Sequence, residues 1–172
     1  MRPASAALPI AHLALRILIV VNWVVGAAIL VLLTVLPHEQ WILSALKLTP
    51  SPEADRIIFG LRAVALFGLA AVPLHYACLK RLFAIVQTVR GGDPFVAANA
   101  DRLQAIGWAL LMLQVLSLVI GAIGASISTP ERPIDLDAGF SMSGWLAVLL
   151  TFLLARVFAE GTRMRADLEG TV

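Results

Sequence analysis

Long apolar stretches alternate with short polar stretches along this chain. A helix that crosses a hydrocarbon core about 30 Å thick needs roughly 20 residues, because each residue adds about 1.5 Å. Four apolar runs reach that length or come close to it, and they cover about 10–36, 57–80, 103–128 and 142–159. The pattern therefore predicts an all-α integral membrane four-helix bundle in which residues 1–172 form a single transmembrane domain.

The polar stretches between the runs predict where the helices end. Ser51-Pro52-Glu53 is a typical helix start, because Ser accepts a backbone N–H and Pro suits the first helical position. The second helix is predicted to continue from Pro52 to about Arg90, well beyond its span. Residues 41–48 are apolar but too short to cross, and predict either a helix at the membrane interface or a loop with one helical turn.

The centre of the chain carries a polar elbow between two long helices. Two glycines end the helix before it, and Asp93-Pro94 begins a new segment. We predict that Asn99 caps the third helix, which starts at Ala100, and that Phe95 fills the apolar gap between the second and third helices. This elbow is the tip of a predicted hairpin over about 81–102, and its structural motif consists of Gly91, Gly92, Asp93, Pro94, Phe95, Asn99 and Arg102.

Apolar residues continue at helical spacing on both sides of the elbow. They predict that the second helix's extension packs against the first turns of the third helix. These residues are Leu82, Phe83, Ile85, Val86 and Val89 on the second helix, and Leu103, Ile106 and Leu110 on the third.

Composition and charge support a membrane location and an orientation. The chain is 60% hydrophobic and 14% charged, too apolar for a soluble domain of this length. The small net charge of +2 and the absence of a basic run argue against direct nucleic-acid binding. Nine of the 13 Lys and Arg residues lie on the side of the elbow and both termini, so the positive-inside rule predicts that this side is cytoplasmic. The helix extensions and the tail 160–172 then form a small cytoplasmic subdomain.

Several polar residues interrupt the spans and are candidates for function. Arg62 either extends its side chain to the interface or pairs with an acidic group of the external loop or a ligand. Asn22 and Gln114 hydrogen-bond between helices, or they line a cavity together with Arg62 and a kink at Pro73. The second alternative corresponds to a small transporter or a binder of a lipid or apolar ligand.

Other residue patterns suggest weaker sites. His12 and His75 lie near the cytoplasmic ends of adjacent spans, and two imidazoles in that position could ligate haem or a metal. Ser117, Gly121 and Ala125 form a small-residue seam for packing within the bundle or for a homodimer. The sequence contains no recognisable catalytic motif and a single cysteine, so we expect neither an enzyme nor a resident cofactor.

Two motifs together are similar to those of the bacterial domain of unknown function 2975 family. The first is Gly92-Asp93-Pro94-Phe95 followed by Asn99, Arg102-Leu103 and Ile106-Gly107, and the second is Val157-Phe158-Ala159-Glu160-Gly161 with Leu168-Glu169-Gly170-Thr171-Val172. The resemblance implies a multi-pass protein of the bacterial cytoplasmic (inner) membrane with no established activity. It also implies a possible partner, a small helix-turn-helix regulator.

These observations favour a membrane-anchored interaction or regulatory protein. The distinctive motifs lie on the predicted cytoplasmic side, whereas the spans lack a continuous polar pathway. The predicted docking surface is the elbow together with the tail residues Leu168, Glu169, Gly170, Thr171 and Val172. Ligand binding within the bundle remains the alternative function, and haem binding a weaker one.

Overall fold

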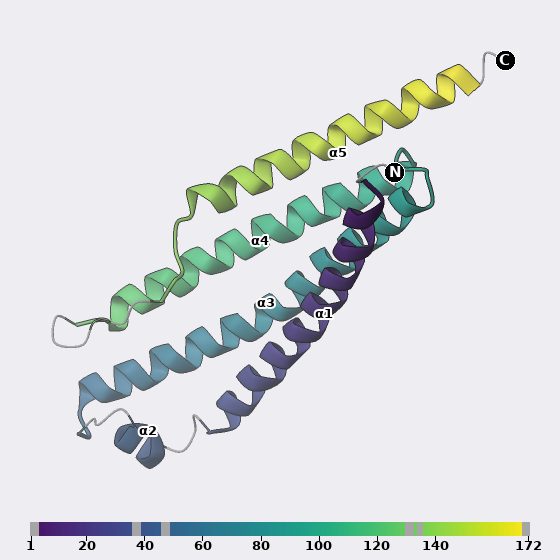
Figure 1. The fold of residues 1–172 in the computed structure, drawn as a ribbon. Helices are drawn as coiled ribbons and strands as arrows, with labels where there is room; N and C mark the ends of the chain where they lie inside the picture. Colours follow the sequence, from purple (N-terminus) through teal and green to yellow (C-terminus); the bar gives the residue numbers. More distant parts are fainter. Residues whose placement is uncertain (1–3, 36–38, 46–48, 130–132, 134–135, 170–172) are drawn as a thin grey trace. The chain divides into compact units, whose positions relative to one another are not determined.

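The computed structural model describes residues 4–35, 39–45, 49–129, 133 and 136–169. Within these residues the chain forms five helices, which are labelled in Figure 1. They are α1 (Ala4–Val35), α2 (Glu39–Ala45), α3 (Pro52–Arg90), α4 (Ala97–Ile127) and α5 (Met142–Glu169). The expected all-helical class is confirmed.

The helix boundaries follow local chemistry closely. α3 begins at Pro52 and ends at Arg90, as predicted, and the Ser51 hydroxyl accepts a hydrogen bond from the Ala54 backbone N–H at 3.2 Å. Glu53 and Asp55 lie in the first turn, where negative charge complements the helix dipole. α4 begins at Ala97 rather than at the predicted Ala100.

Four of the helices are long and apolar enough to cross a membrane. The segments with this character are Pro9–Thr34, Pro52–Arg90, Ala97–Ile127 and Met142–Asp167. Many of their large apolar side chains are exposed on the protein surface, including Val20 and Leu149. So much apolar surface would be unfavourable in water and matches a lipid environment. The chain is therefore a membrane protein with four helices compatible with a membrane bundle.

The chain divides into two compact units, each built from several helix segments. Unit 1 comprises 1–22, 74–112 and 142–172, and unit 2 comprises 23–73 and 113–141. α3 continues through Pro73, where the division between the units falls.

Unit 2 contains a small apolar core around α2. Ile42 of α2 is almost fully buried and clusters with Ile58 and Ala65 of α3, while Ile29 and Leu33 of α1 pack against this cluster. Residues 39–45 thus form a packed helix and not a loop, although residues 46–48 lie outside the described part of the chain. On the same unit, the Arg56 guanidinium donates a hydrogen bond to the Ser126 backbone carbonyl.

Unit 1 joins the first part of α1, the second part of α3, the first part of α4 and the whole of α5. Ile85 of α3 and Ile106 of α4 are buried, whereas Leu82 is 42% exposed. The predicted apolar stripe therefore contributes to the core only in part. Val148 and Ala155 of α5 are buried as well. The elbow between α3 and α4 and the C-terminal end of α5 both belong to this unit (Figure 1).

Candidate functional site

The elbow begins with a glycine-dependent helix end. The Gly92 N–H donates to the Val89 carbonyl at 3.1 Å, and the Asp93 N–H donates to the Thr88 carbonyl at 3.2 Å. This pair of bonds is the Schellman arrangement, which satisfies carbonyls left open at a helix C-terminus. Gly92 has a φ of +85°, a left-handed conformation that glycine adopts at little cost. The two glycines are therefore accounted for by the end of α3.

Asn99 ties the elbow together from inside α4. Its side chain is completely buried, and its amide nitrogen donates to the Thr88 hydroxyl at 2.7 Å and to the Pro94 carbonyl at 2.8 Å. Its amide oxygen accepts a hydrogen bond from the Arg102 guanidinium at 2.8 Å. The amide therefore connects the end of α3, the connecting segment and the first turn of α4.

The prediction that Asn99 caps α4 is wrong. The helix starts two residues before it, at Ala97, whereas a capping residue lies just outside the helix and accepts a backbone N–H from the first turn. The Asn99 amide nitrogen acts as a donor to α3 and the elbow instead. The capping propensity of Asn gave the correct region but the wrong partner.

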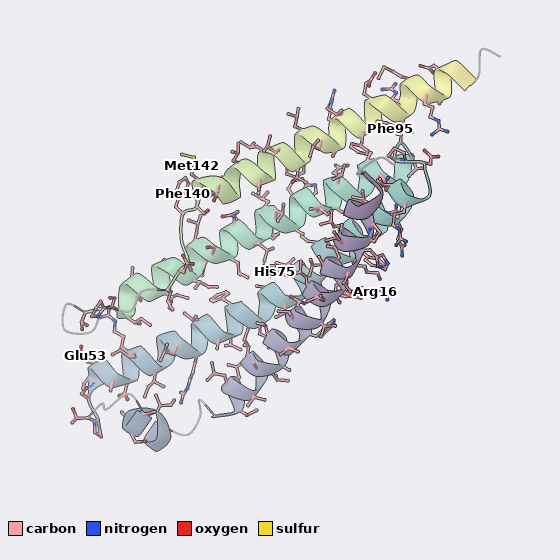
Figure 2. The ribbon with its side chains drawn as sticks, viewed as in Figure 1. Arg16, Glu53, His75, Phe95, Phe140 and Met142 are labelled. Carbon is pink, nitrogen blue, oxygen red and sulfur yellow. The ribbon has the colours of Figure 1, made fainter. Side chains whose placement is uncertain are left out.

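Phe95 packs against α5. Its ring centroid lies 5.4 Å from that of Phe158, with the planes tilted by 33°. A Cβ on Gly161 would lie 3.1 Å from the Phe95 ring, so glycine allows the ring a close approach. Figure 2 shows Phe95 at the elbow on the side of α5. Because Phe95 is 43% exposed, the prediction that it fills a gap between α3 and α4 is wrong.

Replacing Phe95 with Ala should lower the free energy of unfolding by about 2 kcal/mol. A fully buried Phe would cost about 3–5 kcal/mol, and the partial exposure reduces that loss. Thermal or denaturant unfolding in detergent measures it. Phe59→Ala is the matched control, because Phe59 is 73% exposed and should lose less than about 0.5 kcal/mol. Equal losses for the two variants would contradict the packing of Phe95 on α5.

A charged contact and an apolar groove complete this part of unit 1. The Arg165 guanidinium of α5 lies 2.5 Å from the Asp93 carboxylate of the elbow. Beside this pair runs a groove lined by Phe95, Val157, Gly161, Met164 and Arg165. We call these five residues the elbow groove. Val157 and Met164 are more than half exposed, so the groove presents apolar side chains at the surface.

The polar residues that interrupt the predicted spans differ in how deeply they are buried. Asn22 and Arg62 are half-buried, and the Gln114 amide oxygen is buried without a hydrogen-bond donor. The His12 ring lies 4.6 Å from the Phe83 ring, while His75 is exposed. Within the described residues, no three His, Cys, Asp or Glu side chains gather as a metal site.

The small-residue seam receives a loop within unit 2. The Ser117 hydroxyl donates to the Gly139 carbonyl at 3.2 Å and accepts from the Gly139 N–H at 3.0 Å. A Cβ on Gly121 would lie 2.8 Å from the Gly139 Cα. Ala125 is exposed. Two of the three seam residues thus face the chain's own loop.

Sequence reasoning did not assign four residues to the elbow site. Thr88, Phe158, Gly161 and Arg165 complete its contacts, yet they occupy ordinary helical positions. The motif around residues 157–161 marked the correct part of α5 without indicating that Phe95 packs there. Leu168 and Glu169 lie in the last turn of α5, and residues 170–172 fall outside the described chain.

Comparison with known proteins identifies one family. No curated protein and no solved structure matches the chain. The family described as protein of unknown function (DUF2975) matches residues 36–172. The match contains α2 to α5 and the whole elbow, whereas α1 lies outside it. With most of its length matched, including both motifs that suggested the resemblance, the chain belongs to the DUF2975 family of proteins of unknown function.

Proposed function

We propose that this protein is a membrane-anchored interaction protein whose docking face is the elbow groove. The observation that carries the proposal is the apolar character of an open surface. Phe95, Val157 and Met164 are 43%, 53% and 57% exposed, and they line one groove with Gly161 and Arg165. Exposed apolar grooves with polar rims are typical of sites that bind a partner.

The position of the groove along α5 favours a protein partner over lipid tails. No charged residue occurs in α5 from Met142 to Ala155, whereas Arg156, Glu160, Arg163, Arg165 and Asp167 follow. Side chains of this kind belong in the headgroup region or in water. Most of the groove therefore lies beyond the apolar part of the helix, on the side that the distribution of Lys and Arg predicts to be cytoplasmic.

The groove's form and charge suggest the kind of partner. A short apolar groove between the elbow and α5 suits the apolar face of an amphipathic helix. Arg163 lies among the groove residues along α5 and is 80% exposed at its side chain, and its 3.9 Å contact with Glu160 is an exposed pair that contributes little. An acidic edge on the partner helix would therefore be favoured. The family resemblance suggests a small helix-turn-helix regulator, held at the inner face of the bacterial cytoplasmic membrane.

Site-specific photocrosslinking in the native membrane tests this proposal. A crosslinker at position 164 should capture a soluble regulator, which mass spectrometry would identify. The captured protein, produced separately, should then bind the purified full-length chain in detergent. Met164→Asp should weaken that binding at least tenfold, because it places a charge in the apolar groove.

Ala166→Asp is the matched control for the docking experiment. It introduces the same charge at an exposed position on α5 that does not line the groove. If Met164→Asp and Ala166→Asp weaken binding to the same extent, the effect is due to the added charge alone and not to its position in the groove. That outcome, or a captured protein that fails to bind after purification, would refute docking at the elbow groove.

A further inference from the structure

A second surface pocket in unit 1 lies where the first turns of α4 meet α5. It has a volume of about 320 Å³ and is lined by Ala100, Asp101, Gln104, Phe152, Ala155, Arg156 and Ala159. The α5 residues recur at three- and four-residue spacing, so they share one helix face. Only α4 and α5 line the pocket, and Phe95 of the elbow groove does not belong to it.

Two side chains of opposite charge line this pocket without meeting each other. Arg156 and Asp101 are both exposed, and no ion pair joins them within the described residues. Gln104 adds a third polar group to the lining. A cation and an anion that line one pocket without forming an ion pair leave room between them for a ligand that carries both charges.

The pocket lies at the boundary between the polar and apolar parts of both helices. After Asp101 and Arg102, α4 has no charged residue up to its end at Ile127. On α5, Arg156 is the first charged residue after the apolar stretch from Met142 to Ala155. The two helices therefore change character at the same pocket, which is where lipid headgroups meet a membrane protein.

The apolar side of the pocket is formed by a closely packed aromatic ring, Phe152. Phe152 lies 5.4 Å from Trp108 in an edge-to-face arrangement with an angle of 80°, a favourable geometry for two aromatic rings. A Cβ on Gly107 would lie 2.9 Å from the Phe152 ring, so a glycine permits this close contact. Three alanines, Ala100, Ala155 and Ala159, leave the space beside the ring open.

We propose that this pocket binds the headgroup of a zwitterionic aminophospholipid, a phosphatidylethanolamine. The Arg156 guanidinium would bind the phosphate, for which a planar guanidinium is well suited. The Asp101 carboxylate would accept hydrogen bonds from the primary ammonium, and Gln104 would bind the remaining polar groups. The volume accommodates a headgroup but not a whole lipid, so the acyl chains lie along the apolar surfaces of α4 and α5.

The proposal predicts a lipid preference with a distinct dependence on each charge. Phosphatidylethanolamine should bind about tenfold more tightly than phosphatidylcholine, whose quaternary ammonium cannot donate to Asp101. Phosphatidylglycerol should also bind more weakly, since it offers no cation. Asp101→Ala removes the acceptor and should abolish the preference for phosphatidylethanolamine, whereas Arg156→Gln should weaken all three phospholipids by about tenfold.

Native mass spectrometry of the full-length protein with each lipid measures these affinities, and the unfolding temperature without lipid checks that every variant folds. Arg163→Gln and Glu160→Gln are matched controls, because these residues lie on α5 and form an exposed pair at 3.9 Å outside the pocket. Both controls should retain the preference. Tighter binding of phosphatidylglycerol than of phosphatidylethanolamine would overturn the proposal. Loss of the preference for phosphatidylethanolamine in the controls would also overturn it.

Soluble phosphoethanolamine and inorganic phosphate distinguish a lipid from a free headgroup. Neither should compete at concentrations comparable with the lipid, because they lack the chains that pack against the helices. Full competition by phosphoethanolamine would overturn the assignment to a lipid. The docking variant Met164→Asp should leave lipid binding unchanged, so the failure of one proposal can be told apart from the failure of the other.

Discussion

Replacing Asn99 with Ala is expected to lower the free energy of unfolding by about 3 kcal/mol. Each buried polar group that loses its partner costs about 1–3 kcal/mol. The largest loss is at the Pro94 carbonyl, which accepts from the Asn99 amide at 2.8 Å. The Thr88 hydroxyl keeps its own bond to the Ile85 carbonyl at 2.7 Å, and Arg102 is only half-buried, so these two groups lose less. Unfolding in detergent measures the change.

A second substitution separates hydrogen bonding from volume. Asn99→Asp keeps the size of the side chain but replaces the amide donor with an acceptor, so the bonds to Thr88 and Pro94 are lost while Arg102 retains a partner. We expect a loss of about 2 kcal/mol. Gln87→Ala is the control, because it removes an exposed amide from α3, and its effect should be below about 0.5 kcal/mol. A neutral Asn99→Asp variant would show that the elbow does not depend on the donor.

Replacing Gly121 with Val is expected to destabilise unit 2 by about 3 kcal/mol. The new Cβ would lie 2.8 Å from the Gly139 Cα and 2.9 Å from the Ala138 carbonyl oxygen, and backbone atoms cannot move aside as a side chain can. Overpacking of this kind costs about 1–3 kcal/mol. Displacing the loop also breaks both hydrogen bonds between Ser117 and Gly139, each contributing about 1 kcal/mol.

Two further variants and a local measurement make the Gly121 prediction specific. Ala122→Val adds similar bulk at the neighbouring exposed position and should be nearly neutral. Ser117→Ala removes only the hydrogen bonds and should cost about 1–2 kcal/mol. Limited proteolysis between residues 136 and 141 should be faster in Gly121→Val than in the unmodified protein. Ala122→Val should leave the rate of cleavage unchanged. Equal stability of the two valine variants would contradict the close contact between α4 and this loop.

The sequence predicted the helices well because their signals are local. The bounds of α3 followed from Ser51-Pro52 and from the two glycines after Arg90, and the structure places the helix at Pro52–Arg90. Four apolar stretches predicted four long helices, and the structure contains them. Helix propensity, termination by glycine and hydrophobic length act within a few residues, so they can be recognised without knowledge of the partners.

The roles of individual elbow residues were harder to predict. Asn99 has the chemistry of a capping residue, but its amide nitrogen donates a hydrogen bond to Thr88, eleven positions away in the chain. Phe95 is apolar and was expected to be buried between α3 and α4, yet its ring packs on Phe158 and remains 43% exposed. In both cases the side chain's type was informative about the interaction, whereas its partner depended on how α5 and α3 approach the elbow.

The sequence by itself determined that this is a helical membrane protein, where most helices begin and end, and which motifs mark its family. The tertiary structure alone decided that the elbow is tied to α5 through Asp93 and Arg165. It alone decided that Asp101 and Arg156 line one pocket. The physical reason is the range of the interactions. Backbone hydrogen bonding and apolar length are local properties, but charges and rings separated by more than fifty residues reach one site only after the helices pack.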